Sequence, residues 1–145
     1  MNNGKLILLV EDNADEELLT LRAFRKSNIL NEVRVARDGQ EALDLLLRAG
    51  QGADPAFAPQ VVLLDLNLPK VGGLDVLKRL RAREETRFLP VIVLTSSKQD
   101  EDVIRSYSLG ANAYVRKPVD FAQFTEALEA LGLFWLVLNE VPGAS

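Results

Sequence analysis

The sequence predicts an α/β fold, a doubly wound five-stranded parallel sheet with helices on both faces. Short apolar runs alternate along the chain with segments whose apolar residues recur at helical spacing. Three of these runs, within residues 5–10, 60–65 and 90–95, are almost continuously apolar. Such runs are typical of central strands that helices cover on both sides.

The first half of the chain supplies two strands and two helices. KLILLV (5–10) is the first strand, and Asn13 with Glu16 has the spacing of a capping box for a helix that ends near Ser27. EVRVA (32–36) alternates as a strand with one wetter face, and Asp38-Gly39 forms a turn before a helix over 40–49. Residues 50–59 have the Gly and Pro content of a loop.

The second half continues the alternation. QVVLLD (60–65) is the third strand, and a helix follows from about Leu74 to Glu84. PVIVLT (90–95) precedes a helix over 100–109 that Gly110 stops. A shorter fifth strand covers 113–117, and Asp120 caps a last helix that is expected to run into LGLFWLVL, residues 131–138.

Composition limits the possible functions. With 145 residues, we expect one domain over 1–145, with a core of about 5–130 and a C-terminal helix extension and tail over 131–145. Neither a bilayer-length apolar run nor a leader is seen, so we expect a cytoplasmic protein without a membrane. The absence of Cys and His excludes thiolate chemistry, imidazole zinc sites and Ser-His-Asp catalysis. The net charge of −4 argues against nucleic acid as a partner.

The strand ends carry the polar residues that matter most. Glu11-Asp12, Asp65, Thr95 and Lys117 follow or end the first, third, fourth and fifth strands. The carboxyl ends of parallel strands form the working edge of such a sheet. Each residue alone would be an ordinary turn former, strand residue or solvated charge, but the set together predicts a Mg²⁺-assisted phosphoryl site.

The chain resembles response-regulator receiver domains, the phosphoacceptor modules of two-component signalling. Glu11-Asp12, Asp65, Thr95 and Lys117-Pro118 carry this resemblance, together with Tyr114, over about residues 5–130. The resemblance implies the flavodoxin-like strand order 2-1-3-4-5. It also implies a regulator that is not an enzyme, although it assists its own phosphorylation and dephosphorylation.

The resemblance also assigns roles to individual residues. It implies that Asp65 is the phosphoacceptor and that Lys117 and Thr95 bind the phosphoryl oxygens. The Mg²⁺ ligands would be Asp12, Asp65 and the backbone carbonyl of Asn67, with Glu11 acting through water. Thr95 and Tyr114 would form the switch, whereas a plain edge-strand role for Tyr114 stays open. A cis Lys117-Pro118 bond is allowed by the sequence and not required.

More narrowly, the chain resembles the small regulators paired with bacterial and cyanobacterial phytochrome kinases. The segments that carry this resemblance are EDNADEELL, DLNLPKVGG, SYSLGANAY, KPVDFAQF and FWL. The implied partner is a sensor histidine kinase, in that case a bacteriophytochrome. Lys70 is interpreted as a surface charge near the partner's approach. The alternatives are a phosphate sink or phosphorelay shuttle, a degenerate receiver that only binds protein, and a flavodoxin-like cofactor binder. Glu11-Asp12 and the lack of G-x-G-x-x-G disfavour the last of these.

The C-terminal residues suggest how the signal leaves the protein. Only 26 residues follow Val119, so we expect no effector domain and an output through protein contacts. LGLFWLVL is apolar on every side, which is typical of an interface. We expect a homodimer through this helix and through the face of the fourth helix, fifth strand and fifth helix, with Phe134, Trp135 and Leu136 as its anchors.

Overall fold

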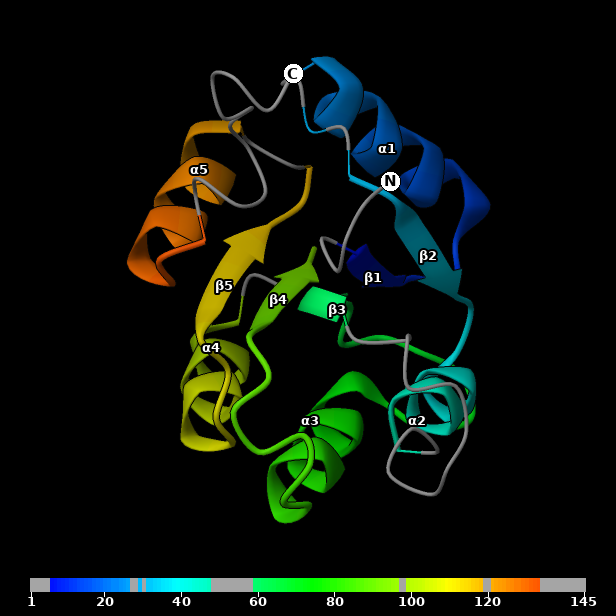
Figure 1. The fold of residues 1–145 in the computed structure, drawn as a ribbon, viewed down its shortest axis with the longest axis vertical. Coiled ribbons are helices and arrows are strands. Elements are labelled where there is room, and N and C mark those ends of the chain that lie inside the picture. Colours follow the sequence, from blue (N-terminus) through cyan, green and yellow to red (C-terminus); the bar gives the residue numbers. More distant parts are fainter. Residues whose placement is uncertain are drawn as a thin grey trace.

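The computed structural model describes residues 6–26, 29, 31–47, 59–96, 99–118 and 121–133. It confirms the predicted fold, since five parallel strands form one sheet in the order β2-β1-β3-β4-β5 (Figure 1). The strands are β1 (Leu6–Val10), β2 (Val33–Ala36), β3 (Pro59–Leu64), β4 (Val91–Thr95) and β5 (Ala113–Arg116). That residues 1–145 form one domain stays a prediction.

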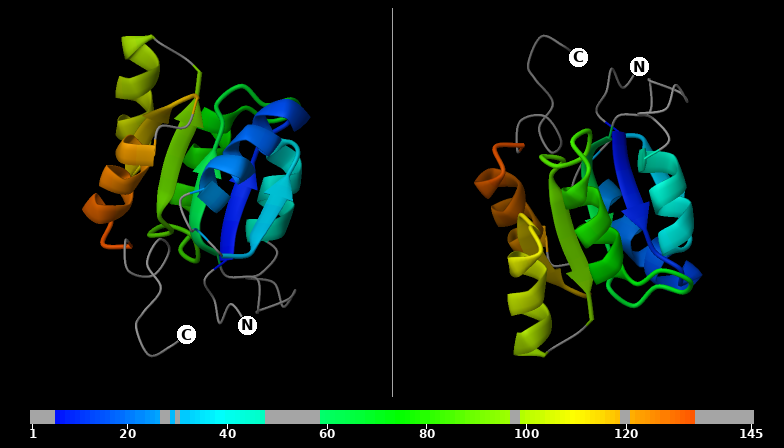
Figure 2. Two further views of the ribbon diagram at one scale, coloured as in Figure 1. Left: turned by 90° about the horizontal axis from the view of Figure 1, so that it is seen from above. Right: turned by 90° about the horizontal axis from the view of Figure 1, so that it is seen from below.

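The helices lie on both sides of the sheet (Figures 1 and 2). Above the sheet in Figure 1 are α1 (Ala14–Lys26) and α5 (Phe121–Ala130). Below it are α2 (Gly39–Leu47), α3 (Gly73–Ala82) and α4 (Asp100–Ser108). The sequence alternation therefore predicts each of these ten elements, with differences mainly at their ends.

Each side of the sheet has its own apolar core, because alternate strand residues point to opposite faces. Ile7 and Leu63 pack with α1 and α5, whose Phe24 and Phe124 rings stack at 5.2 Å between centroids. Leu8 and Leu64 pack with α2 and α3 on the other side. Burial of both strand faces explains why β1, β3 and β4 read as nearly continuous apolar runs.

Side chains cap the starts of α1 and α2. The Glu16 backbone N–H donates to Asn13 Oδ1 at 3.0 Å, and the Glu41 N–H donates to Asp38 Oδ1 at 2.7 Å. Only half of the predicted capping box forms, because the Asn13 N–H donates to Glu11 Oε2 at 3.2 Å. The carboxylate of Glu16 is therefore available for another contact.

The prediction that the last helix runs into residues 131–138 is wrong for residues 131–133, the part of this range that the structure describes. Helix α5 ends at Ala130, and Gly132 follows with φ of 73°. The Leu133 N–H donates to Leu128 O at 2.9 Å and the Gly132 N–H to Glu129 O at 3.0 Å, which is a Schellman C-cap. Glycine adopts the left-handed conformation at little cost in free energy, so it readily ends a helix. The prediction gave more weight to the apolar residues around Gly132 than to this glycine. Phe134, Trp135 and Leu136 lie outside the described residues.

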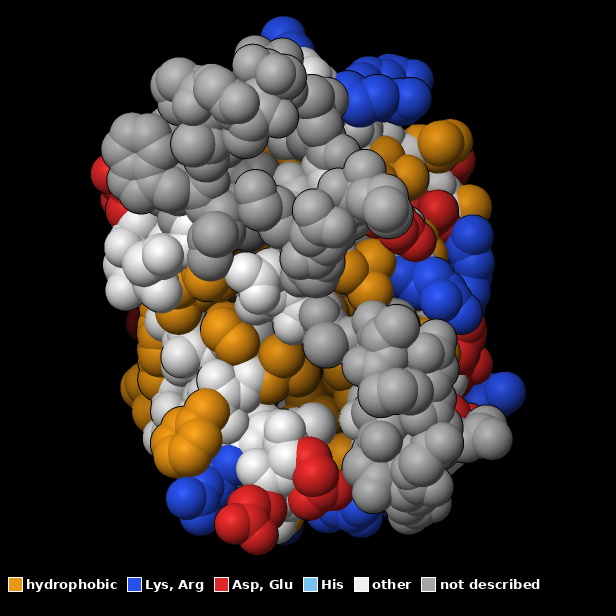
Figure 3. Space-filling view, in the orientation of Figure 1, with side chains coloured by type: hydrophobic (Ala, Val, Ile, Leu, Met, Phe, Trp, Pro, Cys, Tyr) orange, Lys and Arg blue, Asp and Glu red, His pale blue; other side chains and the backbone are white. Residues whose placement is uncertain are grey.

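The surface of the described part carries both signs of charge. In Figure 3, acidic and basic side chains lie interspersed along the edge that holds α1 and β2. Within the described ranges, none of the helices is both long enough and apolar enough to cross a lipid bilayer.

Candidate functional site

The polar residues of three strand ends meet at one ammonium group. Lys117, which follows β5, donates from Nζ to Asp65 Oδ2 at 2.9 Å and to Glu11 Oε1. Asp65 follows β3 and Glu11 follows β1, so the parallel sheet brings together residues 106 positions apart. Thr95 closes β4, and its carbonyl accepts the Lys117 backbone N–H at 2.9 Å. Of the residues predicted at the strand ends, Glu11, Asp65 and Lys117 contact one another.

The site is more buried than the sequence indicates. The side chains of Glu11, Asp65 and Lys117 are 1%, 7% and 6% exposed, and Thr95 is fully buried. Asp65, the proposed phosphoacceptor, therefore has little exposed surface.

Burial and charge determine how the site holds its protons. Burial raises the pKa of Glu11 from 4.5 to about 7, although the hydrogen bond from Lys117 opposes the shift. Burial would lower the pKa of Lys117, but the hydrogen bonds from its ammonium to Glu11 and Asp65 outweigh burial and raise it. Lys117 therefore stays charged, and Glu11 changes its protonation near neutral pH.

This shift predicts a pH dependence of stability for the metal-free chain. Because the folded state holds the Glu11 proton more tightly, the stabilisation is fully present below about pH 4.5 and lost as pH rises through about 7. The difference corresponds to about 3 kcal/mol in the free energy of unfolding. Urea unfolding of the original chain and of Glu11→Gln, across this pH range with a chelator, measures it. The original chain should lose stability that Glu11→Gln does not lose, and parallel curves would contradict the assignment.

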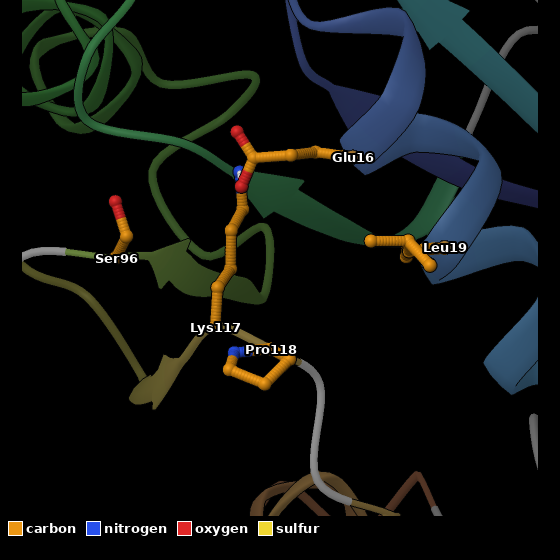
Figure 4. A pocket seen from close by; sticks show the side chains of 6 residues that line it. Glu16, Leu19, Ser96, Lys117 and Pro118 are labelled. Carbon is orange, nitrogen blue, oxygen red and sulfur yellow. Dashed lines mark ion pairs between the residues drawn. The ribbon is translucent and has the colours of Figure 1, made fainter.

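One acidic residue of the site is not among the sequence-predicted site residues. Among the described residues, the carboxylates of Glu11, Glu16 and Asp65 lie close enough to share a cation, with ligand oxygens within 4.8 Å. Glu16 Oε1 lies 3.3 Å from Lys117 Nζ (Figure 4). Asp12, a predicted metal ligand, is exposed and is not in this group. We had assigned Glu16 to helix capping alone. The available signal was its place in the first turn of α1, shortly after the end of β1.

The loop from β3 to α3 fixes the acceptor carboxylate. The Asn67 N–H donates to Asp65 Oδ1 at 3.2 Å, and the Gly73 N–H donates to Leu66 O at 2.9 Å. The loop turns at Lys70, whose φ of 68° and flanking Val71 N–H to Pro69 O bond of 2.8 Å define a γ-turn. Lys70 is 69% exposed and lies 3.6 Å from Asp38, which fits the predicted surface charge.

The remaining predicted residues lie around this centre. Tyr114 is half-buried on β5, opposite Val93, and packs with the α2–α3 side of the core. The Lys117–Pro118 peptide bond is cis. A cleft of about 230 Å³ next to Lys117 is lined by Glu16, Leu19, Thr20, Ser96 and Pro118 (Figure 4).

Comparisons with known proteins agree with this geometry. The family model of the response regulator receiver domain matches residues 7–129. The probable methanogenesis regulatory protein FilR2 of Methanothrix harundinacea is 42% identical over 95% of this chain and 88% of its own length. The bacteriophytochrome response regulator AtBRR has a TM-score of 0.81 and 52% identity, covering 94% of this chain and 98% of that structure. The Mn²⁺-bound form of response regulator Rcp1 has a TM-score of 0.72 and 33% identity, covering 96% and 99%. The chain therefore belongs to the response regulator receiver domain family and is related to phytochrome response regulators.

Proposed function

We propose that this protein accepts a phosphoryl group on Asp65 from a sensor histidine kinase and signals through protein contacts as a single receiver domain in the cytoplasm. The observation that carries the proposal is the contact of Asp65 Oδ2 with Lys117 Nζ at 2.9 Å, inside an acidic cluster at the strand ends. A carboxylate held beside a fixed positive charge is suited to accept a phosphoryl group.

The proposed reaction transfers a phosphoryl group from a histidine of the donor to the Asp65 carboxylate. A carboxylate oxygen of Asp65 forms a bond to phosphorus while the bond from phosphorus to the donor's imidazole nitrogen breaks. The ring nitrogen keeps the electron pair of the broken bond, and the imidazole takes up one proton from solvent. The products are a mixed anhydride on Asp65 and a neutral histidine on the donor. Lys117 supplies a positive charge to a phosphoryl oxygen, and the Thr95 hydroxyl donates to another.

Magnesium is the proposed cofactor, and the residues fit it. Three carboxylates face a single ammonium, an excess of negative oxygen that suits a hard divalent cation. Asp12, Asp65 and the backbone carbonyl of Asn67 would hold the ion, with Glu11 acting through water. Bound there, the ion would neutralise charge on the transferring phosphoryl group.

The partner is proposed to dock beside the cleft. Leu18 and Leu19 on α1 are 54% and 56% exposed, and Leu19 lines the cleft next to Lys117. Exposed apolar side chains at the entrance to a reactive site are suited to a partner that delivers a group. The relation to bacteriophytochrome response regulators favours a bacteriophytochrome kinase as this partner.

The output is proposed to pass through the α4–β5–α5 face. Ile104, Tyr107 and Phe121 are exposed there, by 64%, 49% and 49%. This face and the C-terminal residues Phe134, Trp135 and Leu136 would form a homodimer, with Thr95 and Tyr114 linking it to the site. Light scattering at high micromolar concentration tests the dimer, and a monomer with and without phosphorylation would contradict it. In that case a phosphate sink or a relay shuttle remains.

The proposal predicts phosphoryl uptake from a small donor. After incubation with Mg²⁺ and acetyl phosphate, intact mass spectrometry should show the gain of a single phosphoryl group. Acetate is the leaving group, so no kinase is needed for this reaction. A chelator should suppress the gain, because the donor and the acidic cluster repel each other without a cation. A chain that gains no mass would refute the proposal.

A further inference from the structure

The ammonium of Lys117 faces a third carboxylate, that of Glu16, which is neither the phosphoacceptor nor one of the proposed metal ligands. Two of its N–H groups donate to Glu11 and Asp65. An ammonium has three N–H donors, so one remains for a phosphoryl oxygen. Glu16 Oε1 lies 3.3 Å from the same nitrogen (Figure 4). A negative oxygen of the protein therefore already lies where Lys117 would meet the phosphoryl group.

The three carboxylates differ in how firmly they are held. Glu11 is 1% exposed, and its second oxygen accepts the Asn13 N–H. Asp65 is 7% exposed, and its second oxygen accepts the Asn67 N–H. Glu16 is 37% exposed and reaches the site from the first turn of α1, at the rim of the cleft. It can therefore turn into solvent without leaving a buried charge, unlike the other two.

We propose that Glu16 is a positioning residue that occupies the phosphoryl-binding side of Lys117 in the unphosphorylated chain and must release Lys117 for Asp65 to be phosphorylated. This inference rests on the proposed function, since it concerns the same site. It assigns to Glu16 a restraint on phosphorylation: the carboxylate competes with the incoming phosphoryl oxygens for one cation. The restraint is modest, because the pair is partly exposed to water.

The test compares the initial rate of phosphoryl uptake in three variants. Glu16→Gln removes the competing charge and should take up phosphoryl from acetyl phosphate about two- to fivefold faster than the original chain, the scale of a partly exposed ion pair. Glu16→Asp keeps the charge on a shorter side chain that reaches Lys117 less well, so it should also be faster. Asp15→Asn is the matched control, because Asp15 is exposed on the same turn and lies outside the cluster.

The salt dependence of the uptake rate distinguishes the proposed role of Glu16 from a purely structural one. The ratio of the Glu16→Gln rate to the original rate should fall toward one near 1 M salt, where the Debye length is about 3 Å. A change in folding stability alone would not produce this dependence, and thermal unfolding of each variant provides the comparison.

Other outcomes would overturn the inference. An uptake rate of Glu16→Gln that equals the original rate or falls below it would overturn the inference. Slower uptake together with a higher Mg²⁺ requirement would make Glu16 a metal ligand instead. If Asp15→Asn accelerates uptake as much as Glu16→Gln, the cause is a general charge effect. If Glu16→Asp takes up phosphoryl at the original rate, the cause is repulsion of the donor at the rim of the cleft. Failure of the proposed function is distinct, because the original chain would then gain no phosphoryl group, and the inference would fall with it.

Discussion

Asp65→Asn is expected to abolish phosphoryl uptake from acetyl phosphate, as measured by intact mass. An amide oxygen is not a nucleophile at neutral pH, and the variant is nearly the same size as the original. The Asn67 N–H and the Lys117 ammonium now contact Asp65 Oδ1 and Oδ2, and only one of these two donors can contact the single amide oxygen of the variant. Folding of the variant is therefore measured alongside uptake.

The control is Asp75→Asn, which removes an acid from the exposed face of α3. Asp75 lies 3.3 Å from Arg79 and is 51% exposed, so the change should leave uptake unaffected. Folding of Asp65→Asn can be checked through Glu11, since the Asp65 charge raises the Glu11 pKa. In both chains the loss of stability should begin near the unfolded Glu11 pKa of 4.5, and in this variant it should be smaller and complete at a lower pH. Equal uptake by Asp65→Asn would place the phosphoryl group on another residue.

Gly73→Ala is expected to destabilise the fold by about 3 kcal/mol and to slow phosphoryl uptake. A Cβ at Gly73 would lie 2.2 Å from Asp65 O and 2.6 Å from Leu66 Cα. Both are backbone atoms at the end of β3, so neither can turn aside as a flexible side chain would. Helix α3 must then move away from the strand that holds the acceptor, and the position of Asp65 changes with it.

Gly72→Ala is the matched control one residue earlier. A Cβ at Gly72 would meet Leu66 O only at 3.9 Å, and the residue has φ of −68°, which alanine adopts freely. Urea unfolding should place Gly72→Ala within about 1 kcal/mol of the original chain. Similar stabilities for the two alanine variants would show that α3 is not held against β3 by this close approach.

The sequence alone determined the elements and the edge of the sheet at which the chemistry lies. Apolar runs alternating with helical periodicity predict a parallel sheet, because such strands need helices on both faces. The carboxyl ends of parallel strands share one edge, so Asp65 and Lys117 could be placed together from their positions after β3 and β5. The strand-end residues together predicted a magnesium site, whereas the individual roles of Asp12 as a ligand and of Tyr114 as a switch came from family resemblance.

Tertiary structure decided the features that depend on side-chain direction and backbone conformation. Glu16 fits a capping box by spacing, but the Asn13 N–H bonds to Glu11, and the Glu16 carboxylate turns to Lys117 instead. Composition could not show where α5 ends, because Gly132 stops the helix through left-handed backbone and two hydrogen bonds. The near-complete burial of Asp65 likewise arises only when the sheet forms and brings Asp65 and Lys117, 52 positions apart, into contact. Sequence patterns carry local periodicity, whereas these features depend on which groups become neighbours after folding.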